Sequence, residues 1–292
     1  RILHSNVVLD AIDALQDPGS TPEQRSTVKG DALFYRALNF YELAQVFSPQ
    51  YSSESASTNY GIPLKSSPDV GDPTVRSTVQ QTYDRIIDDL RLAAGLLPLV
   101  ASPKTRPSKV ASWALLARTF LVMQEYDSAA KYSDLCLQEY DPLLDYNSIS
   151  YNDPLPFQSF NDEVIFHANS RFNYSFAMQK VDSVLYGTYD NNDLRKPAFF
   201  SDNFDGTFSP KGNYSGFDHL TPFAGIATDE MYLVRAECRA RKGLVDESMD
   251  VLNKLLQKRW LSGSFIPFNA SNASEALNII LLERRKELVF RS

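Results

Sequence analysis

The feature that most constrains the fold of this chain is a pair of small residues twelve positions apart, which occurs twice. Ala117 and Ala129 form the first pair, and Ala236 and Ser248 form the second. Apolar residues at helical spacing surround each pair. A small side chain on each of two successive helices lets the helix axes approach closely. The repetition therefore predicts two helical hairpins.

The residues around the first pair follow the tetratricopeptide pattern of Trp, Leu-Gly, Tyr, Ala, a second aromatic residue and Pro. Trp113 and Leu116 match it directly. Ala117, Phe120 and Ser133 stand where the pattern has Gly, Tyr and the second aromatic residue. The second copy uses Tyr232, Ala236, Gly243, Ser248, Leu252 and Leu255. The predicted fold class is all-α, built from tetratricopeptide-like helical hairpins with a long irregular insert.

Three further helices are predicted outside these hairpins. Apolar residues at helical spacing run from Lys29 to Phe47, where Ser48-Pro49 ends the helix. A second helix follows Thr78, and a third begins near Asn272, which forms a capping box with Glu275.

Charged residues on these helices are predicted to face solvent. Asp88-Asp89 lies off the apolar face of its helix, which is typical of an exposed acidic edge. On the last helix, Glu283 is expected to pair with Lys286 on the solvent side. The alternative pair is Glu287 with Arg284, and either pair contributes about 0.2–0.5 kcal/mol.

Residues 141–225 differ from the rest of the chain because aromatic residues are mixed there with Asn, Asp, Ser, Gly and Pro. Helical periodicity is lost, although Glu163–His167 has the composition of a short strand. A connection of this length in a compact domain is usually functional. The chain is predicted to be a single domain over 1–292, with a helical scaffold at 1–140 and 226–292 and an aromatic insert at 141–225.

Composition disfavours several partners. The net charge is −7, and the chain has no stripe of clustered Lys and Arg of the kind that binds a phosphate backbone. Nucleic acid and anionic membrane surfaces are therefore not predicted as partners. No run of apolar residues reaches the length of a membrane-spanning helix. Cys136 and Cys238 lie in apolar helical patterns and are predicted to be buried hydrophobic residues.

No catalytic pattern is found. The chain has no phosphate-binding Gly-rich loop, no His-Glu-x-x-His and no Gly-x-Ser-x-Gly. The segment 212–216 has the glycines but a misplaced Ser, and it is predicted to be a turn. Asp190–Asp193 offers oxygen atoms to Ca²⁺ but lacks the spacing and the distal Glu of a calcium loop, so an Asx-rich turn is predicted. The sequence predicts no catalytic residue, no metal ligand, no cofactor and no enzyme.

Seven different segments of the chain occur in the order in which similar motifs occur in one protein family. The two most specific are Met231–Glu237 and Glu283–Phe290. The others are Lys29–Phe47, Tyr60–Leu64, Arg76–Leu90, Arg106–Arg118 and Asn192–Arg195. Together they resemble the RagB/SusD, or SusD-like, family of nutrient-uptake proteins and cover most of the chain.

Two departures from the family pattern are present. The N-terminal stretch with a lipid-bearing cysteine is missing, and the sequence stops at Arg291-Ser292 where the family continues with Gly and Arg. We therefore expect either a piece of a longer protein or a shortened relative.

The resemblance implies an outer-membrane lipoprotein on the extracellular face, attached through a lipid anchor that this chain lacks. It implies non-catalytic binding of an oligo- or polysaccharide and delivery of that glycan to a partner, a SusC-like TonB-dependent transporter. Two alternatives stay open. Tetratricopeptide repeats commonly hold peptides in a concave groove, so the chain could be a peptide-binding scaffold. A glycoside hydrolase would need a suitably spaced pair of carboxylates.

The aromatic insert is the predicted ligand site, although its rings could instead cap the helical core. A sugar ring has an apolar C–H face that an exposed aromatic ring covers, and a polar rim that Asn, Asp or Arg can bind. The predicted ligand-binding residues are Tyr51, Tyr60, Tyr174, Phe176, Tyr186, Tyr189, Asp190, Asn191 and Arg195.

Overall fold

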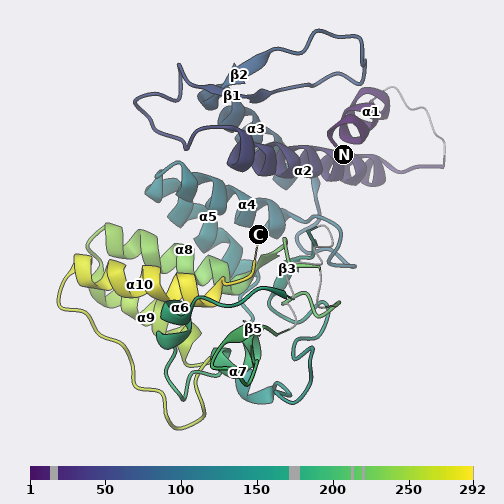
Figure 1. Ribbon diagram of the computed structural model, residues 1–292. Helices are drawn as coiled ribbons and strands as arrows, with labels where there is room; N and C mark the ends of the chain where they lie inside the picture. Colours follow the sequence, from purple (N-terminus) through teal and green to yellow (C-terminus); the bar gives the residue numbers. More distant parts are fainter. Residues whose placement is uncertain (14–18, 171–177, 212–213, 219–220, 292) are drawn as a thin grey trace. The chain divides into compact units, whose positions relative to one another are not determined.

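The computed structural model describes residues 1–13, 19–170, 178–211, 214–218 and 221–291, and these fold mainly into helices (Figure 1). The predicted all-α fold of helical hairpins is confirmed. The chain forms two compact units, Arg1–Glu139 and Tyr140–Ser292. The predicted single domain with its scaffold and insert stays a prediction.

The first unit consists of helices and one antiparallel pair of strands. Its elements are α1 (Ile2–Ile12), α2 (Pro22–Phe47), β1 (Tyr60–Pro63), β2 (Arg76–Thr78), α3 (Val79–Leu96), α4 (Lys109–Val122) and α5 (Tyr126–Glu139). Capping boxes begin two of the helices, with Thr21 and Gln24 at α2 and with Thr78 and Gln81 at α3.

The first predicted hairpin is formed by α4 and α5. Ala117 and Ala129 are both fully buried, as close approach of the two helices requires. The rings of Phe120 and Tyr132 stack in parallel with centroids 5.6 Å apart. Ser133, which replaces an aromatic residue of the repeat, is buried and donates its hydroxyl to the carbonyl of Ala130 at 2.9 Å.

The prediction of a solvated acidic edge on α3 was wrong for Asp89. Its carboxylate is buried and accepts two hydrogen bonds of 2.7 Å from Arg36 of α2. A third guanidinium nitrogen donates to Asn6 at 3.1 Å. A bidentate partner of opposite charge makes burial of this carboxylate possible. Asp88, one residue earlier, is exposed as predicted.

The second unit contains the three longer helices of the second half of the chain and several short elements. Its elements are η1 (Tyr146–Ser148), β3 (Val164–Phe166), α6 (Ser183–Gly187), α7 (Arg195–Phe199), β4 (Phe200–Asp202), β5 (Phe208–Pro210), β6 (Ile226–Ala227), α8 (Thr228–Arg241), α9 (Val245–Leu256) and α10 (Ala273–Glu287). Strand β3 lies in the predicted segment and pairs with β6, and β4 pairs with β5, both antiparallel. No described helix combines the length and the apolar character needed to cross a bilayer.

Helices α8 and α9 form the second predicted hairpin. Ala236 and Ser248 are fully buried, as in the first hairpin. Helix α10 begins after Asn272, whose side chain accepts from the backbone nitrogen of Glu275 at 3.0 Å. The carboxylate of Glu275 reaches the backbone of Ser271 rather than that of Asn272, so the reciprocal bond falls one residue earlier than predicted.

The second unit also contains a group of buried charged side chains that we call the arginine cluster. Arg195 donates to Asp193, Glu283 and Glu287 at 2.5–3.0 Å. Arg259 donates to Glu287 at 2.7 Å and to Glu163 at 2.6 Å. The cluster consists of Arg195, Arg259, Arg291, Lys286, Glu163, Asp193, Asp229, Glu283 and Glu287.

The arginine cluster corrects the prediction for the last helix. Glu283 and Lys286 do pair, at 2.8 Å, but both are buried rather than on the solvent side. Glu287 is also buried and pairs with Arg195 and Arg259. These side chains face inward because each finds an opposite charge there, which offsets the cost of removing it from water.

Aromatic rings from the insert fill a core of their own. Tyr146, Phe157, Phe199, Tyr214 and Phe223 are buried and meet in edge-to-face or tilted contacts with centroids 5.2–6.2 Å apart. Such contacts are favourable beyond the burial of area alone. The interpretation that rings of the insert cap the core therefore holds for these five.

Candidate functional site

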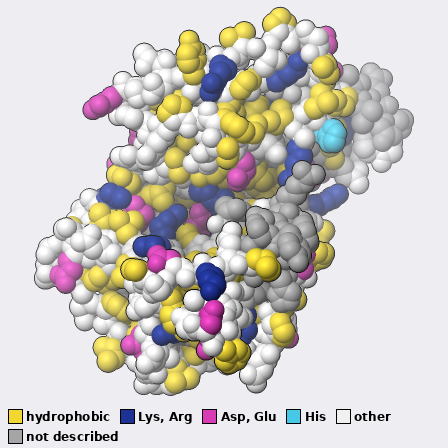
Figure 2. Space-filling view, viewed as in Figure 1, with side chains coloured by type: hydrophobic (Ala, Val, Ile, Leu, Met, Phe, Trp, Pro, Cys, Tyr) yellow, Lys and Arg dark blue, Asp and Glu magenta, His cyan; other side chains and the backbone are white. Residues whose placement is uncertain are grey.

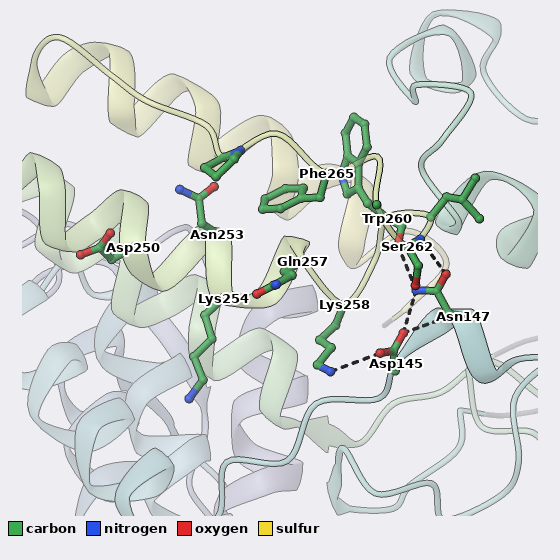
Figure 3. A pocket seen from close by; sticks show the side chains of 13 residues that line it. Asp145, Asn147, Asp250, Asn253, Lys254, Gln257, Lys258, Trp260, Ser262 and Phe265 are labelled. Atoms are coloured by element: carbon green, nitrogen blue, oxygen red, sulfur yellow. Dashed lines mark hydrogen bonds and ion pairs between the residues drawn. The ribbon is translucent and has the colours of Figure 1, made fainter.

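A groove of about 700 Å³ lies in the second unit, where the loop between α9 and α10 passes over the end of α9 (Figure 3). The size suits a ligand of several rings. The groove is lined by Asp145, Asn147, Asp250, Asn253, Lys254, Gln257, Lys258, Trp260, Leu261, Ser262, Gly263, Phe265 and Pro267. We call it the Trp260 groove.

Helix α9 supplies one side of the Trp260 groove because its polar residues recur at helical spacing. Asp250, Asn253, Lys254 and Gln257 are three or four positions apart and share one face. The other face is apolar and buried, and it carries Val251, Leu252, Leu255 and Leu256. The amphipathic pattern therefore fixes which side chains the helix presents to the groove.

Two asparagine side chains hold the loop that forms the other side. Asn253 donates to the carbonyl of Phe268 and accepts from its backbone nitrogen, both at 2.9 Å. Asn147 donates to the carbonyl of Trp260 and accepts from the backbone nitrogen of Ser262, both at 3.0 Å. Because each Asn side chain both donates to and accepts from the backbone of the loop, the loop is held at two points.

The fixed loop presents aromatic rings to the groove. The centroids of Trp260 and Phe265 are 5.9 Å apart with the rings inclined at 61°, and Phe268 lies 6.3 Å from Trp260. Trp260 and Phe265 line the groove and are only half-buried. Two exposed ring surfaces beside polar side chains are the arrangement that a sugar ring requires.

Both lysines of the groove are paired with carboxylates. Lys258 lies 3.2 Å from Asp145, and Lys254 lies 3.4 Å from Asp141. Partial burial acts to raise the pKa of Asp145, but hydrogen bonds from Asn147 and the neighbouring Lys258 outweigh it and lower that pKa. Asp145 is thus an anion at neutral pH and is not suited to act as a general acid.

The arginine cluster supports the base of the groove. Arg259, which precedes Trp260, donates to the carbonyl of Leu144 at 2.7 Å, next to Asp145. Its guanidinium lies 4.1 Å from the ring centroid of Tyr146, and all of it is buried. The chain on both sides of the groove is therefore attached to one buried cation.

The only strongly raised acid pKa near the groove belongs, among the described residues, to Glu163. Burial raises its pKa to about 7, although Arg259 acts in the opposite direction. Its oxygens accept from Arg259 at 2.6 Å and from the hydroxyl of Tyr214 at 2.5 Å. Because Glu163 is fully buried and does not line the groove, it cannot reach a ligand there.

Two predicted site residues of the insert are buried. Tyr189 packs beside Phe200 and donates its hydroxyl to the carbonyl of Lys286 at 2.8 Å. Arg195 is 0% exposed at the centre of the arginine cluster. Neither side chain presents a surface to solvent.

Other predicted residues of the insert lie around Lys196. The Lys196 amine is 4.8 Å from the ring of Tyr186 and 3.4 Å from the side-chain oxygen of Asn191. Tyr186 is half-buried and stacks on Phe208 at 3.6 Å. Asp190 is exposed and accepts from the backbone of Asn192 at 2.8 Å, which forms the predicted Asx turn. Tyr174 and Phe176 lie outside the described residues.

The two predicted residues of the first unit differ in exposure. Tyr51 is buried, meets Tyr83 edge to face at 5.2 Å and donates to Gln80 at 2.8 Å. Tyr60 is 70% exposed, with the guanidinium of Arg76 6.0 Å from its ring. None of the seven predicted residues that the structure describes lines the Trp260 groove.

The sequence did not predict the groove residues, because aromatic residues mixed with polar ones are concentrated in the insert and pointed to that segment instead. The signal for them is the run Trp260–Phe268, which has three aromatic residues among Ser, Gly and Pro between two predicted helices. Among the described residues, no three His, Cys, Asp or Glu side chains are grouped to hold a metal ion.

The fold and the groove define a helical-repeat protein with an open groove lined by polar and aromatic side chains. Residues 1–121 match the sequence model of a SusD-like family described as starch-binding and associating with the outer membrane. Over residues 1–121 the chain is thus similar to the family that its segments were found to resemble. No curated protein sequence matches it.

Solved structures share this fold over nearly the whole chain. A SusD-like carbohydrate-binding protein from Bacteroides vulgatus aligns with a TM-score of 0.76 and 23% identity over 99% of this chain and 65% of its own. A SusD superfamily protein from Bacteroides thetaiotaomicron aligns with a TM-score of 0.80 and 23% identity over 99% of this chain and 70% of its own. A laminarin-binding SusD-like protein aligns with a TM-score of 0.70 and 18% identity over 99% of this chain and 73% of its own. This chain thus spans about two thirds of the length of the first of them.

Proposed function

We propose that this protein binds a glycan without transforming it, and that the Trp260 groove holds the sugar. The observation that carries the proposal is the pair of half-buried rings, Trp260 and Phe265, facing polar side chains of α9 across an open groove. The rings cover the apolar face of a sugar, and the polar groups bind its hydroxyls. The carbohydrate-binding names of similar structures support the same ligand class.

The absence of catalysis is part of the proposal. A glycosidase needs one carboxylic acid with a raised pKa and a second carboxylate across the scissile bond. Asp145, one of the two acids of the groove, has a lowered pKa and an ion pair with Lys258. We expect no new reducing ends when the protein is incubated with a polysaccharide that it binds. Steady release of products would favour the hydrolase alternative instead.

The proposal extends to delivery of the glycan to a SusC-like TonB-dependent transporter at the outer membrane, on its extracellular face, with a lipid anchor outside this sequence. Support comes from the family description, which names association with the outer membrane. Co-purification with a SusC-like transporter produced in the same cells would test this step.

The experiment that tests glycan binding compares Phe265→Ala with Ile266→Ala on the same loop. Phe265 lines the groove, whereas Ile266 is 79% exposed and does not line it. Native affinity gels with a panel of polysaccharides identify a ligand, and calorimetry measures its Kd. We expect Phe265→Ala to weaken binding about tenfold, which corresponds to about 1.4 kcal/mol of lost ring contact. Ile266→Ala should leave the Kd unchanged.

Two results would count against this assignment. Retardation by no polysaccharide in the panel, with parent protein that is folded by circular dichroism, would remove the glycan from the proposal. Equal binding by both variants would place the site elsewhere, and the exposed or half-buried predicted residues Tyr60, Tyr186, Asp190 and Asn191 would be tested next. Binding of peptides instead of glycans would favour the tetratricopeptide scaffold.

A further inference from the structure

We infer that the Trp260 groove accepts an uncharged glycan, and that the Gln257 side chain is the group that reads the hydroxyls of its sugar. This inference rests on the proposed glycan-binding function and names the ligand class of the same site. Three observations carry it: the pairing of both lysines, the use of the other amides, and the exposure of Gln257 in the groove that the rings line.

The charges of the groove leave little attraction for an anionic sugar. Among the described residues, two Asp and two Lys line the groove, and no Arg does. Lys258 and Lys254 already lie within 3.4 Å of the carboxylates of Asp145 and Asp141. Carboxylate and sulfate groups are best bound by uncommitted cations, above all by the two-pronged guanidinium of Arg.

Arg259 is the arginine closest in sequence to the rings, but it is unavailable to a ligand. It is fully buried, and all three of its nitrogens donate to groups of the protein, namely Glu163, Glu287 and the carbonyl of Leu144. On the face shown in Figure 2, the Lys and Arg side chains of the described residues are interspersed with acidic and apolar ones rather than gathered into one patch. The net charge of −7 further opposes a polyanion.

The amides of the groove divide into two kinds. Asn147 and Asn253 each donate to and accept from the backbone of the loop, and Asn147 also donates to Asp145. Gln257, by contrast, is exposed, and within the described parts of the chain its side chain makes no hydrogen bond. It lines the same groove as Phe265, and both side chains are labelled in Figure 3.

An amide suits an uncharged sugar because it offers a donor and an acceptor at once. Two neighbouring hydroxyls of a sugar can then bind the two ends of one Gln side chain. A ring stacked on Phe265 would present its rim to Gln257, so recognition would use stacking and neutral hydrogen bonds. Such binding depends little on salt, since no ion pair is made.

The test uses the whole chain and two groups of polysaccharides in native affinity gels. Laminarin, xylan, galactan and mannan are the neutral probes, and polygalacturonate, alginate and chondroitin sulfate are the anionic ones. We expect retardation by at least one neutral polymer, with a Kd from calorimetry that changes less than about twofold between 50 mM and 500 mM NaCl. Loss of a neutral hydrogen-bonding group costs about 0.5–1.5 kcal/mol, so Gln257→Ala should weaken binding roughly two- to tenfold. Ile266→Ala should not change it.

The outcomes separate this inference from the proposed function. Retardation by anionic polymers alone, weakened by salt and by Lys254→Met with Lys258→Met, would overturn the uncharged-glycan inference and leave glycan binding in place. A neutral ligand bound equally by Gln257→Ala and Ile266→Ala would overturn the role of Gln257. No retardation by any polymer would overturn both the inference and the proposed function. Thermal melts of each variant confirm that it is folded.

Discussion

Replacing Arg195 with Met tests whether the arginine cluster holds the second unit together. The guanidinium makes four hydrogen bonds, two to Asp193 and one each to Glu283 and Glu287, and every partner is at most 4% exposed. Met has a similar length but no charge, so Arg195→Met leaves these carboxylates buried with one cation fewer. The remaining Lys286 lies 3.0 Å from Asp193 and 2.8 Å from Glu283.

The expected loss follows from comparison with an exposed pair. Removing one partner of a buried ion pair costs about 3–5 kcal/mol, mostly because the other charge is left uncompensated. Arg285 instead pairs with Asp182 at 3.3 Å, with side chains 60% and 52% exposed. Arg285→Met is the matched control and should cost less than about 1 kcal/mol.

Urea unfolding followed by tryptophan fluorescence measures the difference. Trp113 lies in the first unit and Trp260 in the second, so a Trp113→Phe background reports on the second unit alone. With a urea m-value of about 2 kcal/mol/M, Arg195→Met should lower the midpoint by about 1.5–2.5 M. A midpoint within about 0.5 M of the parent, as expected for Arg285→Met, would refute the reasoning.

Three further predictions follow from the same structure. Burial raises the pKa of Glu163 from its ordinary 4.5 to about 7. The folded state therefore binds this proton more tightly than the unfolded state does. The resulting stabilisation is fully present below pH 4.5 and is lost as the pH rises through 7. Glu163→Gln, which mimics the protonated acid, should therefore flatten the fall of unfolding free energy between these pH values, and an unchanged slope would contradict this. Asn253→Ala removes both hydrogen bonds to Phe268, and hydrogen exchange at the Phe268 amide should accelerate while the core of α8 stays protected. Cys136 and Cys238 are buried thiols that form no disulfide, and burial raises the pKa of Cys238 to about 12. Neither thiol should therefore react with Ellman's reagent until urea unfolds the chain; fast labelling of the native protein would show that a thiol is accessible.

The helical hairpins could be predicted because the information for them is local. Ala117 and Ala129 lie twelve positions apart on consecutive helices, and their neighbours repeat with the period of a helix. Thr78 and Asn272 accept the hydrogen bonds that cap their helices within three residues. Packing in these regions joins neighbours in the sequence, so a pattern read along the chain is sufficient.

The buried charges could not be predicted from the same patterns. Asp89 and Glu283 lie off the apolar faces of their helices in the sequence pattern, and an isolated amphipathic helix would turn such residues to water. Their partners are distant in the sequence: Arg36 is 53 residues from Asp89, and Arg195 is 88 from Glu283. Only the folded chain shows that each acid faces a cation.

Two segments of the family pattern that are distant in the sequence are in contact in the folded chain. Asn192–Arg195 and Glu283–Phe290 are the two sides of the arginine cluster, since Arg195 binds Asp193 beside it and Glu283 and Glu287 on α10. A change in either segment would leave charge buried without a partner. These motifs thus report on the framework behind the site rather than on the ligand.

The residues of the proposed ligand site depend on contacts between distant parts of the chain, and this is why they escaped prediction from the sequence. Aromatic rings of the insert, such as Tyr189, were candidates because they are many, yet a ring is as well suited to a core as to a sugar. What separates the two roles is whether the backbone holds the ring at a surface. In the loop after α9, Asn147 and Asn253 bind the backbone on either side of Phe265 and keep its ring at the groove. Asn147 is 115 residues from the Ser262 amide that it binds, so the position of that ring depends on a contact that no local pattern contains.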